Sequence, residues 1–318
     1  MRAFGNVLEG DHASHVSLEE ALAQTGVAPL VWLHLDANDP ECIAWLEHQS
    51  CLNPIVIAAL VATETRPRAE AIEGGALINL RGLAEDPEKI DDSLASIRIW
   101  AEKGRVISVF RHRLTAMPKV EAKMIEGRLR DPGDLIAAIA VAITEQLDPD
   151  VAGLGDELDD CEEGLDGERL YALRRTISRV RSQSIGYRRF VSPQRDALER
   201  LSALPADWLA DDDRLHLKEA ADRAARMAEE LEAVRERAAL MHEQVMDLRA
   251  EQLDTRALLI SVVALVFLPL TFITGLLGMN VEGIPFAHEP WAFQGVLWVC
   301  VAIAVAITGY FLRAHWFR

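Results

Sequence analysis

Two long runs of uncharged residues near the C-terminus constrain the fold more than any other feature. Residues 257–277 form a run of 21 uncharged residues, and residues 291–312 form a second run of 22. Each run matches the ~20 residues that an α-helix needs to cross a hydrocarbon core. Buried helices of a soluble core are the alternative, and two adjacent runs of this length fit that alternative poorly. The sequence therefore predicts a transmembrane domain over 257–318, with an outer loop at 278–290.

The basic residues predict how these spans are oriented. Arg249 and Arg256 precede the first span, Arg313 and Arg318 follow the second, and the loop at 278–290 contains no Lys or Arg. Basic residues concentrate on the cytoplasmic side of a membrane. The N-terminus also lacks the apolar run of a cleavable signal peptide. We therefore expect both termini in the cytoplasm and the loop outside.

Composition excludes several functional classes. The chain has 50 Asp and Glu against 33 Lys and Arg, a net charge of −17. A nucleic-acid binder needs a basic surface, so we expect no nucleic-acid partner. The four cysteines form no CxxC pair, which disfavours a zinc knuckle. Glycine-rich phosphate loops and the HExxH and GxSxG motifs are also missing, so we expect neither an enzyme nor a bound cofactor.

Residues 1–165 have the pattern of an α/β domain. Runs rich in β-branched and aromatic residues predict strands at 31–35, 76–80, 96–100 and 105–110. The last two flank residues 102–104 and resemble a hairpin with Gly104 in its turn. Asp39-Pro40 and Asn53-Pro54 each place an N-cap residue before a proline, which predicts two helix starts. A sheet covered by helices follows from this pattern.

Strand signals fade after Met117. Residues 134–147 and 169–187 have helical patterns, with the acidic run 156–163 between them, and Pro193 and Pro205 interrupt the next stretch. The acidic run and Cys161 could bind zinc, but a solvated acidic face is the favoured interpretation.

The region 166–256 includes the most regular apolar repeat in the chain. Its positions alternate three and four apart and are mostly small: Leu217, Ala220, Ala224, Met227, Leu231, Val234, Ala238, Met241, Val245 and Leu248. This 3.5-residue repeat predicts the seam of a long stalk helix. We expect that helix to continue into the first span.

A second stripe with the same spacing continues through the first span. Its residues are acidic, small or hydroxylic apart from one leucine: Asp247, Ala250, Asp254, Ala257, Ser261, Ala264, Leu268, Thr271, Gly275 and Gly278. Small residues on a membrane helix usually mean close helix packing. The acidic end favours the lining of a water-filled pore instead. Two helices cannot enclose a channel, so a pore requires a closed ring of subunits.

The outer end of this stripe reads Gly278-Met279-Asn280. An uncharged amide at a helix mouth offers an acceptor oxygen without a fixed charge. A ring of such oxygens suits a cation that keeps its water shell. We therefore expect Asn280 to contact the hydrated ion in its outer shell.

The sequence resembles the CorA superfamily of divalent-cation transporters, which have two spans and a Gly-Met-Asn loop. Within this superfamily, the sequence is more similar to the ZntB zinc-transporter branch. The similarity is carried by the segment Phe267-Leu-Pro-Leu-Thr-Phe-Ile-Thr-Gly-Leu-Leu-Gly-Met-Asn280. Further matches lie at 31–35, 65–68, 193–196 and 281–285, so the resemblance covers nearly the whole chain.

The resemblance implies a homopentameric funnel in an inner membrane, with an α/β cytoplasmic domain, a long stalk helix and two C-terminal transmembrane helices. The first span would line the pore, with Thr271, Leu268 and Ala264 at pore-facing positions. Gly278, Met279 and Asn280 would form the entrance. This loop departs from the branch by carrying Glu282, His288 and Glu289. These side chains would help to collect zinc, because imidazole and carboxylate are zinc ligands.

Three functions are compatible with these residues. The leading hypothesis is a Zn²⁺ uptake transporter, with coupling to protons left open. The second is a Mg²⁺, Co²⁺ or Ni²⁺ channel gated by cytoplasmic metal, and the third is a membrane-anchored helical scaffold without transport. The expected partners are copies of the same chain, the lipid bilayer, divalent cations and protons.

A few other residues receive structural interpretations. His12 and His15 lie near the terminus and are expected to be incidental. His34 alternates along a strand and is expected to be a satisfied core histidine. Arg66 and Arg68 are expected to make structural ion pairs.

Overall fold

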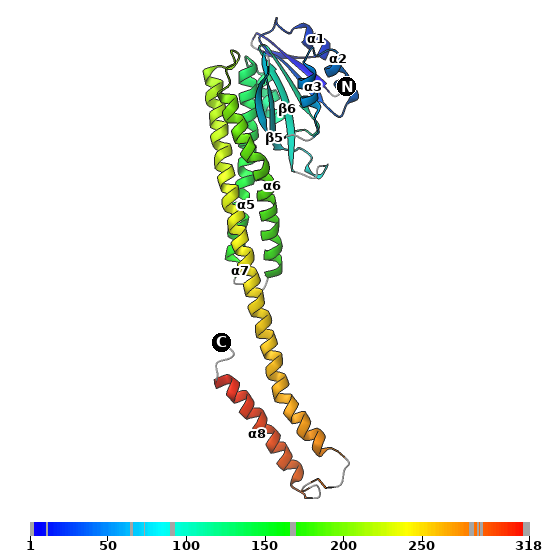
Figure 1. Cartoon of the computed structure of the whole chain (residues 1–318), viewed down its shortest axis with the longest axis vertical. Helices are drawn as coiled ribbons and strands as arrows, with labels where there is room; N and C mark the ends of the chain where they lie inside the picture. The colour runs from blue at the N-terminus through cyan, green and yellow to red at the C-terminus, as the bar shows by residue number, and fades with distance from the viewer. Residues whose placement is uncertain are drawn as a thin grey trace. The chain divides into compact units, whose positions relative to one another are not determined.

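The computed structural model describes residues 3–10, 12–63, 66–72, 74–89, 93–165, 170–279, 283–284, 286 and 289–313. The chain divides into two compact units, residues 1–242 and 243–318 (Figure 1). The first unit contains a sheet and a helical bundle, and the second contains the two apolar helix segments.

A seven-stranded sheet forms the start of the first unit. Its order is β2-β1-β3-β7-β6-β5-β4, with only β3 and β7 parallel among neighbouring strands of the described sheet. The strands span Ala3–Glu9 (β1), His12–Val16 (β2), Val31–Asp36 (β3), Arg68–Ile72 (β4), Gly75–Leu83 (β5), Leu94–Glu102 (β6) and Arg105–Phe110 (β7).

The four expected strands and the expected hairpin are confirmed. β6 and β7 pair from Ile97 opposite Phe110 to Glu102 opposite Arg105, leaving a two-residue turn. Gly104 in that turn has a φ of +77°, a conformation that a residue without a side chain adopts without strain. β1, β2 and β4 were not predicted. β2 and β4 are five-residue edge strands whose exposed faces carry polar residues, whereas β1 is an inner strand whose apolar pattern is interrupted by Gly5 and Asn6.

Short helices cover the sheet: α1 (Leu18–Ala23), α2 (Pro40–His48), α3 (Pro54–Val61) and α4 (Met117–Ile125), with a 3₁₀ turn, η1, at Pro87–Lys89. The two predicted starts are confirmed, because the Asp39 side chain accepts from the backbone N–H of Glu41 and that of Asn53 from Ile55. One hydrophobic core lies between α1–α3 and a sheet face that includes Leu33, Leu77 and Ile107.

Two longer helices extend beyond their predicted ranges. α5 runs over Pro132–Glu163, so the acidic run is part of the helix, and α6 runs over Leu170–Ser202 with Pro193 inside it. The expectation that Pro193 interrupts the chain is wrong. Buried residues on both sides of it, among them Phe190 and Ala197, keep one apolar face continuous, and this packing outweighs the lost backbone hydrogen bond.

The predicted long helix is present as α7, Asp211–Leu277. Every position of the predicted seam from Leu217 to Val245 is buried, and Leu248 is half-buried. The small seam residues Ala220, Ala224 and Ala238 have no exposed surface, which indicates close approach of neighbouring helices.

The second unit contains the end of α7 and the helix α8, Ala292–Arg313. Both helices are long and apolar enough to cross a membrane. Half-buried residues follow one side of α8, among them Val296, Cys300, Ile303 and Ile307. This spacing gives the helix one face suited to packing on a neighbour.

Candidate functional site

The stripe on α7 is exposed along its full length in the single chain. From Asp247 to Gly278, each of its ten positions is exposed, including Leu268 with 75% of its surface accessible. Among the described residues of its unit, none buries the stripe, so close packing of this face would require a second copy of the chain.

The half-buried residues of the same helix lie on another face. They are Leu258, Val262, Val266, Pro269, Leu270 and Ile273. At ~100° per residue, this face points roughly opposite to the stripe. The first span therefore has one apolar face with partial cover and one small, hydroxylic face without cover.

The hydroxyl groups of this segment are held by their own helix. The Ser261 hydroxyl donates to the Ala257 carbonyl at 2.8 Å, and the Thr271 hydroxyl donates to the Phe267 carbonyl at 2.8 Å. Because each hydrogen is directed at the backbone, the oxygen lone pairs remain available on the outside. The stripe therefore presents hydrogen-bond acceptors, which suit water around a cation.

The mouth of the stripe is described in part. Gly278 donates its backbone N–H to the Thr274 carbonyl at 2.9 Å, and a Cβ at this position would lie 2.9 Å from the same oxygen. Glycine therefore allows a tight end to α7. Met279 and Glu289 are exposed, and Asn280, Glu282 and His288 lie outside the described residues.

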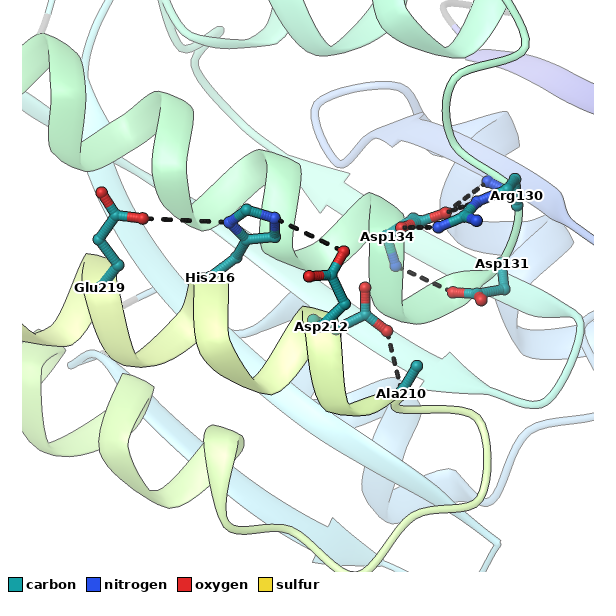
Figure 2. Close-up of polar contacts among 8 residues, drawn as sticks. Arg130, Asp131, Asp134, Ala210, Asp212, His216 and Glu219 are labelled. Carbon is teal, nitrogen blue, oxygen red and sulfur yellow. Dashed lines mark hydrogen bonds and ion pairs between the residues drawn. The ribbon is translucent and has the colours of Figure 1, made fainter.

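An acidic cluster at the start of α5 and α7 was not predicted. One carboxylate oxygen from each of Asp131, Asp134 and Asp213 lies within 4.8 Å of the others. Asp131 caps α5 by accepting the Asp134 N–H at 2.9 Å, and Asp134 accepts from the Arg130 side chain at 2.9 Å (Figure 2). Asp213 accepts from the Ala210 N–H at 2.9 Å. The cluster therefore serves as a junction between two helix starts.

Two carboxyl groups of this junction have opposite pKa shifts. Burial raises the pKa of Asp213 to about 6, and the neighbouring Asp131 and Asp134 add to the rise. Burial acts in the same direction on Asp134, but hydrogen bonds from Arg130 outweigh it and lower the pKa of that carboxyl. Asp213 therefore keeps its proton to a higher pH than Asp134 does. The sequence signal for this site is the Asp131-x-x-Asp134 cap. The third carboxylate of the cluster, Asp213, lies 79 residues after Asp134 and has no local signal.

Three other residues singled out in the sequence, His34, Arg68 and Cys161, have structural roles. His34 is buried, its Nδ1 lies 2.7 Å from the Ser108 hydroxyl, and burial lowers its pKa to about 3, so it is the expected neutral core histidine. Arg68 lies 3.6 Å from Glu70 as an ion pair. Cys161 is buried, whereas Asp159 and Glu162 point outward to Arg237. This arrangement supports a solvated acidic face at 156–163.

Comparison with protein families gives one match over most of the chain. The family profile described as "CorA-like Mg2+ transporter protein" matches residues 28–313. The "Zinc transport protein ZntB" of Pectobacterium atrosepticum is 31% identical over 286 residues, which cover 90% of this chain and 87% of the relative. The protein of the same description from Cronobacter sakazakii is 30% identical over the same coverage.

Solved structures share the fold. The full-length CmaX protein superposes with a TM-score of 0.80 at 30% identity, covering 99% of this chain and 98% of that one. The CorA magnesium transporter from Methanocaldococcus jannaschii gives a TM-score of 0.78 at 18% identity, with 98% of each chain covered.

Proposed function

Because the chain belongs to the CorA-like Mg2+ transporter family, we propose that it carries divalent metal cations across an inner membrane, with Zn²⁺ as its main substrate. Members of this family are transporters, so the chain is not assigned to an enzyme class. The two apolar helices, α7 and α8, supply the membrane spans.

The exposed stripe on α7 is the observation that carries this proposal. It is continuous from Asp247 to Gly278, it lacks bulky side chains apart from Leu268, and its hydroxyl oxygens are free to accept hydrogen bonds. The carboxylates at its start, Asp247 and Asp254, are costly against lipid and favourable against water or a hydrated cation, and the small and hydroxylic positions continue the same face. We assign it to the wall of an axial pore.

A homopentamer is the assembly we propose. Two spans in one chain cannot enclose a conduit, whereas a closed ring repeats the stripe in each subunit. Each stripe residue then becomes a ring: Thr271 a ring of hydroxyl oxygens, and Asp254 and Asp247 two rings of carboxylates. The Gly278-Met279-Asn280 loops would meet at the outer end of that pore.

The loop chemistry favours zinc over magnesium. The family profile that matches the chain is named for Mg²⁺ transport, whereas the relatives with about 30% identity are named as zinc transport proteins. This chain adds Glu282, His288 and Glu289 to its loop. Zinc accepts imidazole nitrogen and carboxylate oxygen, whereas magnesium keeps its water shell and oxygen ligands. The alternative is a Mg²⁺, Co²⁺ or Ni²⁺ channel gated by cytoplasmic metal.

The orientation we propose places both termini in the cytoplasm. Four arginines flank the two spans, and the loop between the spans contains no Lys or Arg. The loop would then face outside and collect incoming ions.

Flux through purified protein in liposomes tests the proposal. We expect Zn²⁺ entry to exceed Mg²⁺ entry, and a second series with an imposed pH gradient measures coupling to protons. Magnesium entry at the higher rate would favour the channel alternative. Entry of neither ion by correctly inserted protein would favour a helical scaffold without transport.

A further inference from the structure

The helices α5 and α6 have opposite charge. α5 carries ten acidic residues and no Lys or Arg, whereas α6 carries eight arginines and two acidic residues. No acidic residue occurs in α6 before Asp196. In a chain with a net charge of −17, α6 is thus a strongly basic segment beside a strongly acidic one.

Much of this charge is exposed and unpaired. On α5, the carboxylates of Asp148, Asp156, Asp160 and Glu163 are exposed and form no ion pair with the described residues; we call these four the acidic face. On α6, Arg175, Arg181 and Arg189 are exposed and likewise form no ion pair within the described parts of the chain; we call these three the arginine face.

Ion pairs between α5 and α6 of the same chain account for little of this separation of charge. Among the described residues, a single ion pair, Arg179 with Glu157, joins α6 to α5. Other charges of the two helices are directed at α7, where Arg237 pairs with Asp159 and Glu162, and Glu232 pairs with Arg188.

These contacts make α5, α6 and the cytoplasmic part of α7 a three-helix bundle. α5 packs on α6, and the ion pairs link each of them to α7. In such a bundle each helix buries one side and presents the other in its own direction. One subunit therefore presents acid in one direction and arginine in another.

We propose that the acidic face of α5 in one subunit packs against the arginine face of α6 in the next subunit of the ring. This inference rests on the proposed homopentamer and adds the contact that joins its cytoplasmic parts. A cyclic ring needs two different, complementary surfaces on each subunit, and these two faces fulfil that condition.

A second copy of the chain fits these faces better than another partner does. Each subunit carries −17, so subunits brought together repel one another unless opposite charges meet locally. Two arginine faces would repel each other, because the arginine face contains no acidic residue. Two acidic faces would repel each other as well, because the acidic face contains no basic residue. Each face is matched by the other.

Cross-linking of the full-length protein tests the contact. Ala152 is exposed on α5 and Ser182 is exposed on α6. One tagged chain carries Ala152→Cys, and a second chain with a different tag carries Ser182→Cys. In both chains the exposed Cys51 is replaced by Ser. The two chains are expressed together in membranes, and the mass of the complex is measured in mild detergent. We expect oxidation to join the two chains, and the yield to fall about threefold or more between ~0.05 M and ~1 M salt, where the screening length is ~3 Å.

Charge reversal identifies the residues responsible. Arg175→Glu with Arg181→Glu and Arg189→Glu should lower the yield, as should Asp148→Arg with Asp156→Arg and Asp160→Arg. Combining both sets should restore it. Glu47→Lys, an exposed reversal on α2, is the matched control and should change nothing.

The outcomes separate this inference from the proposed assembly. A pentameric mass with cross-linking that is insensitive to salt and to both reversals overturns the contact and leaves the pentamer. A monomeric or dimeric mass overturns both. Cross-linking that depends on anionic lipid and ignores the α5 reversal would assign the arginine face to lipid headgroups and would overturn the contact.

Discussion

Ser261 and Thr271 each direct their hydroxyl hydrogen at a carbonyl of their own helix, and this determines what they would offer to an ion in the proposed pore. The outward side of each oxygen accepts hydrogen bonds, as does a carboxylate, but it carries no charge. In the proposed pore, a cation would therefore move past these positions without being trapped. Fixed negative charge on this stripe is confined to Asp247 and Asp254.

Asn280→Ala should remove most Zn²⁺ flux while the protein still folds and inserts. The substitution deletes one amide acceptor per subunit at the entrance and adds no charge, so the hydrated ion loses a ring of contacts. Flux into liposomes measures the effect. Gln294→Ala removes an exposed amide from α8 and is the matched control; unchanged zinc flux in Asn280→Ala would contradict the entrance assignment.

Asp213→Asn should make the protein more resistant to heat at pH 8 than the wild type. The folded pKa of about 6 exceeds the ordinary value of 3.8, so this carboxyl stabilises the fold below pH 4 and loses that contribution as pH rises through 6. Asparagine keeps an acceptor for the Ala210 N–H and has no proton to lose.

Thermal unfolding in detergent at pH 4, 6 and 8 measures that difference. We expect the advantage of Asp213→Asn to be largest at pH 8 and to vanish near pH 4. Asp212→Asn changes an exposed neighbour and should follow the wild-type curve. An advantage of equal size at all three pH values would exclude the titration of Asp213 as its cause.

Asp213 also shows a limit of sequence reasoning for single residues. The run Asp211-Asp212-Asp213 is visible in the sequence as a helix start, but its three members have different environments. Only Asp213 is buried against Gly133, at a site whose missing side chain makes room for the carboxylate. Long-range placement of this kind has no local signal.

Among the elements, α7 is the one in which the sequence is most informative. Its seam and its stripe both repeat every three or four residues, and the structure separates them into a buried face and an exposed one. The sequence pattern and the structure agree here because burial is periodic along a helix, so apolar residues recur at the buried positions.

Ala264→Leu should lower flux without changing the folding of the protein. The larger side chain projects from the stripe, where five copies would narrow the same level of the pore. Val263→Leu adds bulk at an exposed position on another side of the span and is the control. Equal loss of flux in both variants would mean that the stripe does not face the conduit.

Neutralising Asp247 and Asp254 together, as Asn, should reduce cation flux, and the reduction should shrink as salt rises. Carboxylates close to the axis concentrate cations, and screening limits their reach to ~8 Å at physiological salt. Glu19→Gln with Glu47→Gln neutralises two exposed acids elsewhere and should have no effect. An equal reduction in that control would remove the special role of the stripe.

Elements whose signals are weak were missed or misjudged. β1 and β4 lie outside the predicted strands because Gly or polar residues interrupt their apolar pattern; in the sheet β1 pairs with β2 and β3, and β4 pairs with β5. Pro149 and Pro193 lie inside α5 and α6. Tertiary packing decides such cases, and it cannot be judged from a local window.

At the scale of the whole molecule, the proposed conduit requires more than one chain. The family assignment and the two spans could be predicted, because a span needs only length and low polarity. The number of subunits cannot be deduced in this way, because one chain contains no information on how many copies close a ring.

Measurement of the mass in mild detergent should give five copies of the 35.2 kDa chain. The expectation follows from the need for a closed ring and from the family resemblance. The measurement is made on protein that still transports zinc after reconstitution. A mainly dimeric species in such a preparation would contradict the pentamer.

The continuity of α7 restricts how this sequence can change in length. The seam ends at Leu248 and the stripe runs on through Asp254 within one unbroken helix. Deleting a single residue between Leu248 and Asp254 would turn the remainder of the stripe by ~100° relative to the seam and place bulky side chains where small ones now lie. Insertions and deletions of about seven residues, close to two full turns, keep the phase. Evolution can therefore alter the reach of this helix in steps, whereas single-residue gaps between seam and stripe would be removed by selection.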